Sequence, residues 1–224
     1  MGSQVEAEWI QGLPTAWRQR LESILPVVPA PHIIICYGSR WAGLPLPNSD
    51  YDVLMIGEST LSPGESAAVR RTIRRVAPDV DWRWLSLRGA RANRLINPTL
   101  SWAMRTGKVL GHVDLLGEPV PVPVTSLRAA AEDILDDLEG LGRLDDPWAE
   151  EGKAYRQLAK RLVVLEQLLE DRPDARALSH EVTRIMEGGH PEQTIARRAE
   201  RVIARTQALP LNAGDALLRR VVHE

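Results

Sequence analysis

Residues 33–56 read IIICYGSRWAGLPLPNSDYDVLMI, two apolar runs separated by a polar loop. The first run, Ile33–Tyr37, and the second, residues 50–56, are short and bounded by turn residues, which is typical of buried β-strands. Gly38 and Ser39 follow the first run directly, and a loop rich in glycine and proline leads to the second. The sequence therefore predicts two neighbouring buried strands joined by a Gly-Ser turn and a short loop.

The second run begins with the acidic triplet Asp50-Tyr51-Asp52. Alternate residues of a strand face the same side, so Asp50 and Asp52 should present two carboxylates to one site while Tyr51 points away. Two such carboxylates repel each other unless a cation lies between them, and carboxylate oxygens are ligands that Mg²⁺ prefers. Gly38 would allow a phosphate to approach the backbone, and Ser39 adds a hydroxyl donor. These residue types together indicate phosphoryl or nucleotidyl transfer.

A third acidic residue is expected on a neighbouring strand, which we predict over residues 79–87. Asp79, Asp81 and Arg83 alternate along it and should share one face. We prefer Asp81 as the third carboxylate because it lies inside the strand, whereas Asp79 lies at its beginning. Asp81 could bind a metal ion and accept the proton of an attacking hydroxyl group.

The rest of the chain divides at residues 118–125, which read EPVPVPVT. Alternating prolines favour a stiff, extended segment, so we expect a linker there. The order of expected elements is α+β before the linker and all-helical after it. Before it we predict helices at 17–25, from Ser62 to 76 and from 97 to 106, with a short strand at 109–110. After it we predict helices at 126–141, 147–171, 175–187, from 191 onward and at 211–222.

Composition excludes several classes of protein. The chain has 224 residues, of which 44% are hydrophobic and 26% charged, as in ordinary globular proteins. No apolar run is long enough to span a membrane, no secretory signal is expected, and the net charge of −2 argues against a dedicated nucleic-acid-binding protein. Cys36 is the single cysteine, so neither an internal disulfide nor a cysteine-based zinc site is expected. We expect a cytoplasmic protein.

The segment YGSRWAGLPLPNSDYDVLMI, residues 37–56, resembles the signature of the polymerase-beta-like nucleotidyltransferase superfamily. Its spacing from Gly-Ser to the acidic pair is similar to that of aminoglycoside adenylyltransferases and of the minimal nucleotidyltransferases of toxin–antitoxin pairs. The segment TGKVLG, residues 106–111, resembles a piece that often closes this domain. One departure is the bulky Trp82-Arg83-Trp84 after Asp81, where members often have small or apolar residues.

The resemblance implies a fold and a role for each matched residue. The fold would be a mixed sheet flanked by helices over residues 1–118, then a linker at 119–125 and a helical substrate-binding bundle over 126–224. Gly38 and Ser39 would hold the triphosphate. Asp50 and Asp52 would bind two Mg²⁺ ions, with Asp81 as third ligand and base.

Two basic residues are further candidates for nucleotide binding. Arg40 follows the Gly-Ser turn and could contact phosphate, although a surface arginine in a loop is an equally good interpretation. Lys153 shares one helix face with Arg156 and Lys160. In antibiotic-modifying relatives a basic residue of the helical half often reaches the triphosphate, while a solvated charged face is the plainer alternative.

The resemblance implies adenylyl transfer from ATP to a hydroxyl group of a small molecule, with release of pyrophosphate. An aminoglycoside-like compound or another natural-product alcohol is the expected acceptor, which would make the protein an antibiotic-resistance enzyme. Two alternatives stay open: transfer to a protein or RNA acceptor, and a nucleotide-binding regulator without turnover. The sequence contains no feature that decides the base of the nucleotide.

Overall fold

The structure is a computed structural model that describes residues 5–44, 49–141 and 151–223. It is an α+β protein, 66% helical, with a four-stranded mixed sheet. Its internal contacts divide the chain into two units. The sheet unit contains Met1–Arg91 and Gly107–Glu118, and the helical unit contains Ala92–Thr106 and Pro119–Glu224.

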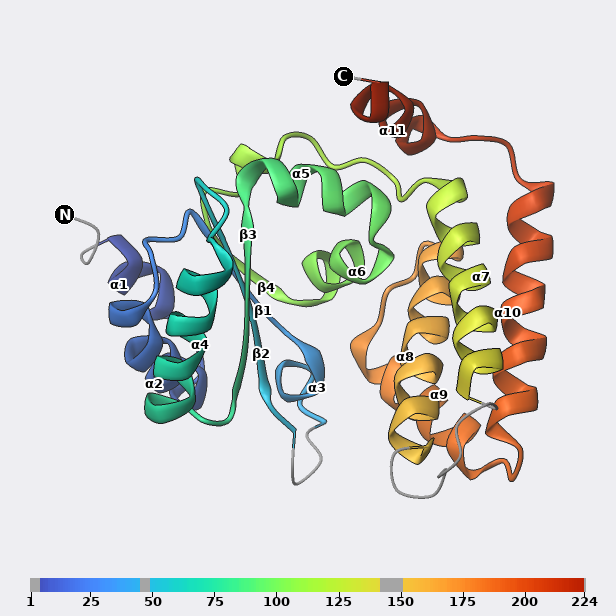
Figure 1. The fold of residues 1–224 in the computed structure, drawn as a ribbon, viewed down its shortest axis with the longest axis horizontal. Coiled ribbons are helices and arrows are strands. Elements are labelled where there is room, and N and C mark those ends of the chain that lie inside the picture. Colours follow the sequence, from blue (N-terminus) through green and yellow to red (C-terminus); the bar gives the residue numbers. More distant parts are fainter. Residues whose placement is uncertain (1–4, 45–48, 142–150, 224) are drawn as a thin grey trace. The chain divides into compact units, whose positions relative to one another are not determined.

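The sheet unit contains all four strands and the N-terminal helices (Figure 1). Its elements are α1 (Val5–Ile10), α2 (Thr15–Ile24), β1 (Ile33–Tyr37), α3 (Gly38–Trp41), β2 (Tyr51–Gly57), α4 (Pro63–Val76), β3 (Val80–Ser86) and β4 (Lys108–Gly111), with 3-10 turns at Leu25–Val27 and Val113–Leu116. Helix α5 (Leu87–Ile96) follows β3, and the unit boundary falls within it.

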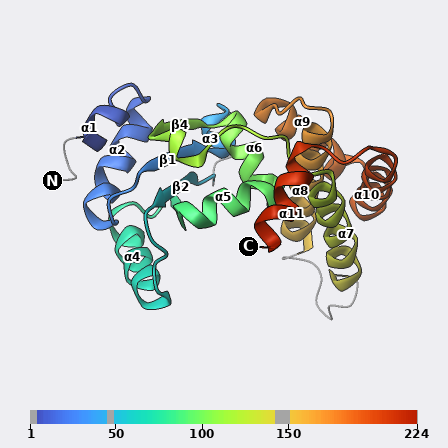
Figure 2. The same ribbon diagram turned by 90° about the horizontal axis from the view of Figure 1, so that it is seen from above.

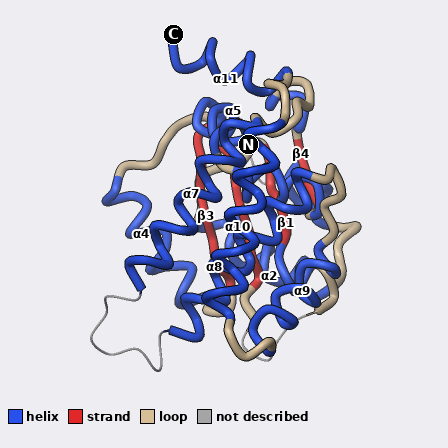
Figure 3. Tube along the Cα trace, turned by 90° about the vertical axis from the view of Figure 1, so that its right-hand side faces the viewer, coloured by secondary structure: helices blue, strands red, loops and turns tan. Residues whose placement is uncertain are grey.

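The four strands form one sheet in the order β3-β2-β1-β4, drawn in red in Figure 3. Strand β1 is antiparallel to both β2 and β4, whereas β2 and β3 run parallel. The parallel pair requires a crossover, and α4 supplies it. The ends of β1, β2 and β3 that carry the sequence-predicted site residues therefore meet at one edge of the sheet.

One face of this sheet packs against α1, α2 and α4 (Figure 1). The strands contribute alternate side chains to the core, among them Ile34, Cys36, Val53, Met55 and Trp82. Since side chains alternate across a strand, the residues between them lie on the opposite face. That opposite face carries Tyr37, Asp52, Asp81 and Arg83.

The start of α4 confirms the helix predicted from Ser62. The Ser62 hydroxyl accepts a hydrogen bond from the Glu65 backbone N–H (3.3 Å), and the Glu65 carboxylate accepts one from the Ser62 backbone N–H (2.8 Å). Pro63 occupies the first helical turn, where its missing N–H costs nothing. Such a reciprocal cap stabilises the helix that carries the chain from β2 to β3.

In the described residues, the helical unit contains five helices after the proline-rich segment, together with α6. The bounds are α6 (Pro98–Thr106), α7 (Val124–Leu141), α8 (Glu151–Leu169), α9 (Ala175–Glu187), α10 (Pro191–Ala208) and α11 (Ala213–His223). Helices α7, α8, α9 and α10 pack side by side (Figure 2). Their shared core is aliphatic, and its fully buried members include Ala131, Ile134, Leu162, Ile195 and Ala199.

The proline-rich segment, expected to be a linker, is fixed to the helical unit by Asp215 near the start of α11. The Asp215 carboxylate is 2% exposed and accepts hydrogen bonds from the backbone N–H of Val124 (3.1 Å) and of Thr125 (3.0 Å). It also accepts from the Thr125 hydroxyl (2.6 Å) and the Asn212 N–H (2.9 Å). One carboxylate therefore caps the beginnings of both α7 and α11.

Replacing Asp215 by asparagine is expected to destabilise the protein by about 1–3 kcal/mol, because an amide group would face donors that need an acceptor. Burial would raise the pKa of Asp215, but the hydrogen bonds from Thr125, Asn212 and Val124 outweigh burial and lower it. The stabilisation is therefore present above the ordinary aspartate pKa and lost as pH falls through the lowered value. Urea unfolding at pH 7 and pH 3 should show a smaller acid loss in Asp215→Asn than in wild type.

The control for this prediction is Asp136→Asn, which changes an exposed carboxylate of α7. It should leave the free energy of unfolding within about 0.5 kcal/mol of wild type. Equal stability of the Asp215 and Asp136 variants would contradict the proposed role of Asp215.

Several expectations need correction. Strand β2 begins at Tyr51, so Asp50 lies just before the strand rather than opening it. The first residues of the expected loop form the helical turn α3, and α1 and α5 were not predicted. The contacts place Ala92–Thr106 with the helical unit, although this segment precedes the proline-rich boundary. The expected start of the long helix at Pro147 falls outside the described residues.

None of the described helices combines the length and the apolar character that crossing a bilayer requires.

Candidate active site

The candidate site lies on a row of three residues across three strands. Tyr37 on β1 is the register partner of Asp52 on β2, and Asp52 is the register partner of Asp81 on β3. Register partners on adjacent strands project from the same face of a sheet. The structure therefore places Asp52 and Asp81 beside each other, with Tyr37 on the other side of Asp52.

Gly38 lies directly against the carboxylate of Asp52. A Cβ atom added to Gly38 would fall 1.9 Å from Asp52 Oδ2, which is far inside van der Waals contact. The backbone of Gly38 has φ +82°, a conformation that favours glycine. The Gly-Ser turn and the acidic strand are thus in contact, and a side chain at this position would have to displace the Asp52 carboxylate.

Asp81 is held by an arginine of its own strand. Arg83 donates to Asp81 Oδ2 through Nη2 at 3.1 Å and through Nε at 3.4 Å. The two side chains are 62% and 40% exposed, so the ion pair contributes at most about 1 kcal/mol. Replacing Arg83 beside Asp81 by another cation would therefore cost little free energy.

Asp79, the alternative third carboxylate, has a different partner. Arg20 on α2 donates to Asp79 Oδ2 through Nη2 (2.9 Å) and Nε (3.2 Å). Arg20 also lies over the ring of Tyr51, 4.7 Å from its centroid. This geometry ties Asp79 to the helix-covered side of the sheet and favours Asp81 as the neighbour of Asp52.

Tyr37 is electrostatically coupled to the charged residues of the row. Burial raises the pKa of Tyr37 to about 12, the guanidinium of Arg83 opposes the rise, and the carboxylates of Asp52 and Asp81 add to it. The pKa of Arg83 is raised, chiefly by Tyr37, while burial opposes the rise and Asp81 and Asp52 contribute to it. Tyr37 therefore remains a neutral hydrogen-bonding phenol throughout the physiological pH range.

The raised pKa of Tyr37 predicts an alkaline loss of stability. A tyrosine whose folded pKa lies near 12 contributes stability that is intact below pH 10 and is lost as pH rises through 12. Urea unfolding at pH 9, 10, 11 and 12 should show a steeper decline in wild type than in Tyr37→Phe. The matching control is Tyr155→Phe in the helical unit. If the free energy of unfolding of wild type declines no more steeply with pH than that of Tyr37→Phe, the raised pKa assigned to Tyr37 would be contradicted.

Arg40, on α3, contacts residues just before and at the start of β2 and so connects the two ends of the loop between α3 and β2. Its Nε donates to the Ser49 carbonyl, and its guanidinium lies 4.5 Å from the centroid of the Tyr51 ring. Tyr51 itself packs edge-on against Trp17 on the helix-covered face, with ring centroids 4.8 Å apart. These contacts give Arg40 a structural task, and its contact with phosphate stays a prediction.

The remaining candidates differ in their surroundings. Asp50 is exposed immediately before β2. The carbonyl of Ser39 accepts a hydrogen bond from Leu44 N–H at 2.9 Å, while its hydroxyl has no hydrogen-bond partner among the described residues. Lys153 is exposed on α8, in the helical unit. The structure therefore brings together Gly38, Asp52 and Asp81.

Sequence reasoning missed Tyr37 and Arg83 as members of the site. The alternation of Asp79, Asp81 and Arg83 was a usable signal, because it placed the arginine on the acidic face. No comparable signal exists for Tyr37, since its place beside Asp52 depends on the register between β1 and β2.

The fit of these residues to a metal ion can be tested on their chemistry. In the part of the chain that the structure describes, no group of three His, Cys, Asp or Glu side chains is arranged to hold a metal ion. The two neighbouring carboxylates are nevertheless hard oxygen donors of the kind Mg²⁺ prefers. The donor set therefore fits Mg²⁺, provided that the cation displaces Arg83 from Asp81.

Comparison with known proteins adds no relative. No family model matches the sequence, and no curated protein and no solved structure is similar enough to count as a match. Function is therefore inferred from the residues of this chain.

Proposed function

We propose that this protein is a metal-dependent nucleotidyltransferase of the polymerase-beta-like kind. It transfers AMP from ATP to a hydroxyl group of a small molecule and releases pyrophosphate. The observation that carries the proposal is the contact of the Gly38 turn with Asp52, which is itself in register with Asp81. This contact supports a phosphate-binding turn next to a pair of carboxylates.

The candidate residues of the Gly-Ser turn and of the two acidic strands have different tasks in this reaction. Gly38 and Ser39 bind the triphosphate, because Gly38 lacks a side chain and the Ser39 hydroxyl is available as a donor. Asp50 and Asp52 would hold Mg²⁺, and Asp81 would be the third ligand. Bound Mg²⁺ would neutralise the phosphate oxygens and the developing negative charge.

The transfer itself requires one bond to form and one to break. The oxygen of the acceptor hydroxyl attacks the α-phosphorus, and the bond from that phosphorus to the bridging oxygen of pyrophosphate breaks. Asp81 accepts the hydroxyl proton, and pyrophosphate leaves as an anion. The protein contributes position and charge, because the reaction needs no covalent intermediate.

We assign Arg83 one partner before substrate binds and a different partner afterwards. Before substrate binds, it pairs with Asp81 and reduces the repulsion between Asp81 and Asp52. Because the pair is exposed, releasing Arg83 costs at most about 1 kcal/mol, which is small beside the several kcal/mol of metal coordination. Arg83 is then available for a phosphate oxygen of the nucleotide.

The experiment that tests this function measures pyrophosphate release. The purified protein is incubated with Mg²⁺ and each of ATP, GTP, CTP and UTP, across a panel of aminoglycosides and other polyols, with Asp52→Asn as the blank. The proposal predicts acceptor-dependent release with ATP that is absent in the blank.

Two other results would overturn parts of the proposal. Release with another nucleotide would overturn the choice of ATP but retain nucleotidyl transfer. If no compound of the panel causes pyrophosphate release although the protein still binds nucleotide, these small acceptors would be excluded. That result would favour a protein or RNA acceptor or a regulator without turnover.

A further inference from the structure

A cavity lies within the helical unit, among α8, α9 and α10. It has a volume of about 910 Å³, and its walls carry five arginines: Arg172, Arg184, Arg198, Arg201 and Arg205. Small-molecule sites usually have volumes of about 300–1,000 Å³. The core residues Val163, Ile185 and Val202 contribute apolar surface to it. The cavity is therefore large enough for a small organic ligand.

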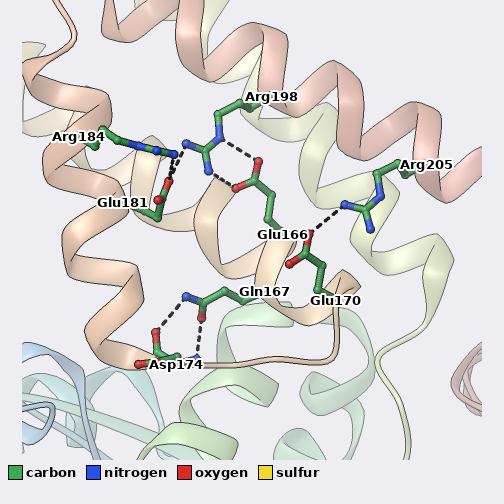
Figure 4. Close-up of polar contacts among 8 residues, drawn as sticks. All are labelled: Glu166, Gln167, Glu170, Asp174, Glu181, Arg184, Arg198 and Arg205. Atoms are coloured by element: carbon green, nitrogen blue, oxygen red, sulfur yellow. Dashed lines mark hydrogen bonds and ion pairs between the residues drawn. The ribbon is translucent and has the colours of Figure 1, made fainter.

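Arg198 and the glutamates around it form a closed network (Figure 4). Arg198 is 13% exposed and binds both carboxylate oxygens of Glu166 and, at 3.2 Å, the carboxylate of Glu181. Glu181 also binds Arg184 at 2.7 Å. These two carboxylates are thus neutralised by the protein itself.

The other two acidic side chains of the cavity are also engaged. Glu170 pairs with Arg205 at 3.3 Å (Figure 4). Asp174 caps α9, because its Oδ1 accepts from the backbone N–H groups of Arg176 (2.8 Å) and Ala177 (3.1 Å). The acidic groups of the cavity are therefore occupied by cations and N–H donors of the chain.

Two arginines of the cavity differ from the others. Arg172 and Arg201 are exposed, and neither guanidinium has a hydrogen bond or ion pair among the described residues. Arg201 lies between Arg198 and Arg205 on one face of α10, at helical spacing. The described lining has five arginines and four acidic side chains, so the cavity carries a net charge of +1, and the guanidinium groups of Arg172 and Arg201 are left as hydrogen-bond donors.

We propose that this cavity binds a small phosphate monoester through Arg172 and Arg201. A guanidinium group binds phosphate through two parallel N–H donors, which makes arginine the preferred residue for this anion. The phosphate group would accept hydrogen bonds from both guanidinium groups, and the organic part would lie against the apolar surface beside Ile185 and Val202. The inference is independent of the proposed nucleotidyl transfer.

Isothermal titration of the full chain with AMP, without divalent metal and with EDTA, tests the site. Leaving out metal separates it from the metal-dependent nucleotide site proposed on the sheet. Wild type and Asp52→Asn should bind AMP equally, whereas Arg201→Gln and Arg172→Gln should each bind about tenfold more weakly, the loss of one charge-assisted contact. Both substitutions change exposed side chains, and circular dichroism should confirm that the fold is intact.

The control is Arg197→Gln, an exposed arginine of the same helix that does not line the cavity. Its affinity for AMP should equal that of wild type. Equal weakening in the Arg197 and Arg201 variants would show nonspecific attraction to α10 and overturn the site. Absence of AMP binding would overturn it as well, and inorganic phosphate binding as tightly as AMP would overturn the ester assignment.

Discussion

Asp52→Asn is expected to reduce nucleotidyl transfer by at least about a thousandfold. The substitution keeps the shape of the side chain and removes the charge that would hold a metal ion beside the triphosphate. A loss of about 4 kcal/mol of electrostatic stabilisation in the transition state corresponds to three powers of ten in rate. Steady-state pyrophosphate release at saturating ATP and Mg²⁺ measures the effect.

The matched control for Asp52→Asn is Asp79→Asn. Asp79 pairs with Arg20 of α2 rather than with the row of Asp52 and Asp81, so its substitution should leave turnover within about twofold of wild type. Equal losses in both variants would mean that loss of an acidic strand residue, and not loss of a metal ligand, lowers the rate.

Gly38→Ala is expected to lower turnover by about a hundredfold and to destabilise the fold by about 1–2 kcal/mol. The destabilisation follows from the positive φ of Gly38, which costs an L residue roughly that amount. The loss of turnover follows from the 1.9 Å clash, which must push the Asp52 carboxylate away from its place beside Asp81. A displacement of about 1 Å in a catalytic group can reduce the rate a hundredfold.

Gly43→Ala separates these two effects. Gly43 also has a positive φ of +75°, but apart from its chain neighbours no atom of the described residues lies within 4 Å of an added Cβ. It should lose similar stability and keep its turnover. A similar loss of turnover in both glycine variants would contradict the role assigned to the contact between Gly38 and Asp52.

The strands were predictable because their signal is local. Ile33–Tyr37 is a continuous apolar run ending in Gly-Ser, and its predicted bounds agree with β1. The capped start of α4 was equally local, since Ser62, Pro63 and Glu65 alone determine it. Helix α5 was missed because its sequence, LRGARANRLI, has only three large apolar residues and contains glycine in its interior.

The pairing of residues within the site could not be predicted from local pattern. Alternation placed Asp81 and Arg83 on one face of their strand, but the register brought Asp81 beside Asp52 and Tyr37. The arginines of the cavity among α8, α9 and α10 are spread over residues 172–205, and tertiary packing alone decides which of them pair with carboxylates. The role of Lys153 is a prediction that the geometry within each unit does not address.

The assignment of residues 92–106 to the helical unit also depends on tertiary contacts. Trp102 on α6 donates through Nε1 to Gln167 Oε1 at 2.7 Å, and Arg105 pairs with Asp171 at 2.8 Å. Both partners lie at the end of α8 or just after it, more than sixty residues away in the chain. The proline-rich boundary at 119–125 was visible in the sequence, whereas the assignment of residues 92–106 to the helical unit was not.

The central claim is that the edge of the sheet around Asp52 binds a divalent metal ion together with a nucleotide. Electron paramagnetic resonance of Mn²⁺ measures this directly, using wild type, Asp52→Asn and Asp79→Asn, each with and without ATP. The account predicts that wild type and Asp79→Asn bind Mn²⁺ tightly in the presence of ATP and that Asp52→Asn does not. Equal binding by wild type and Asp52→Asn, or no binding by wild type, would contradict it.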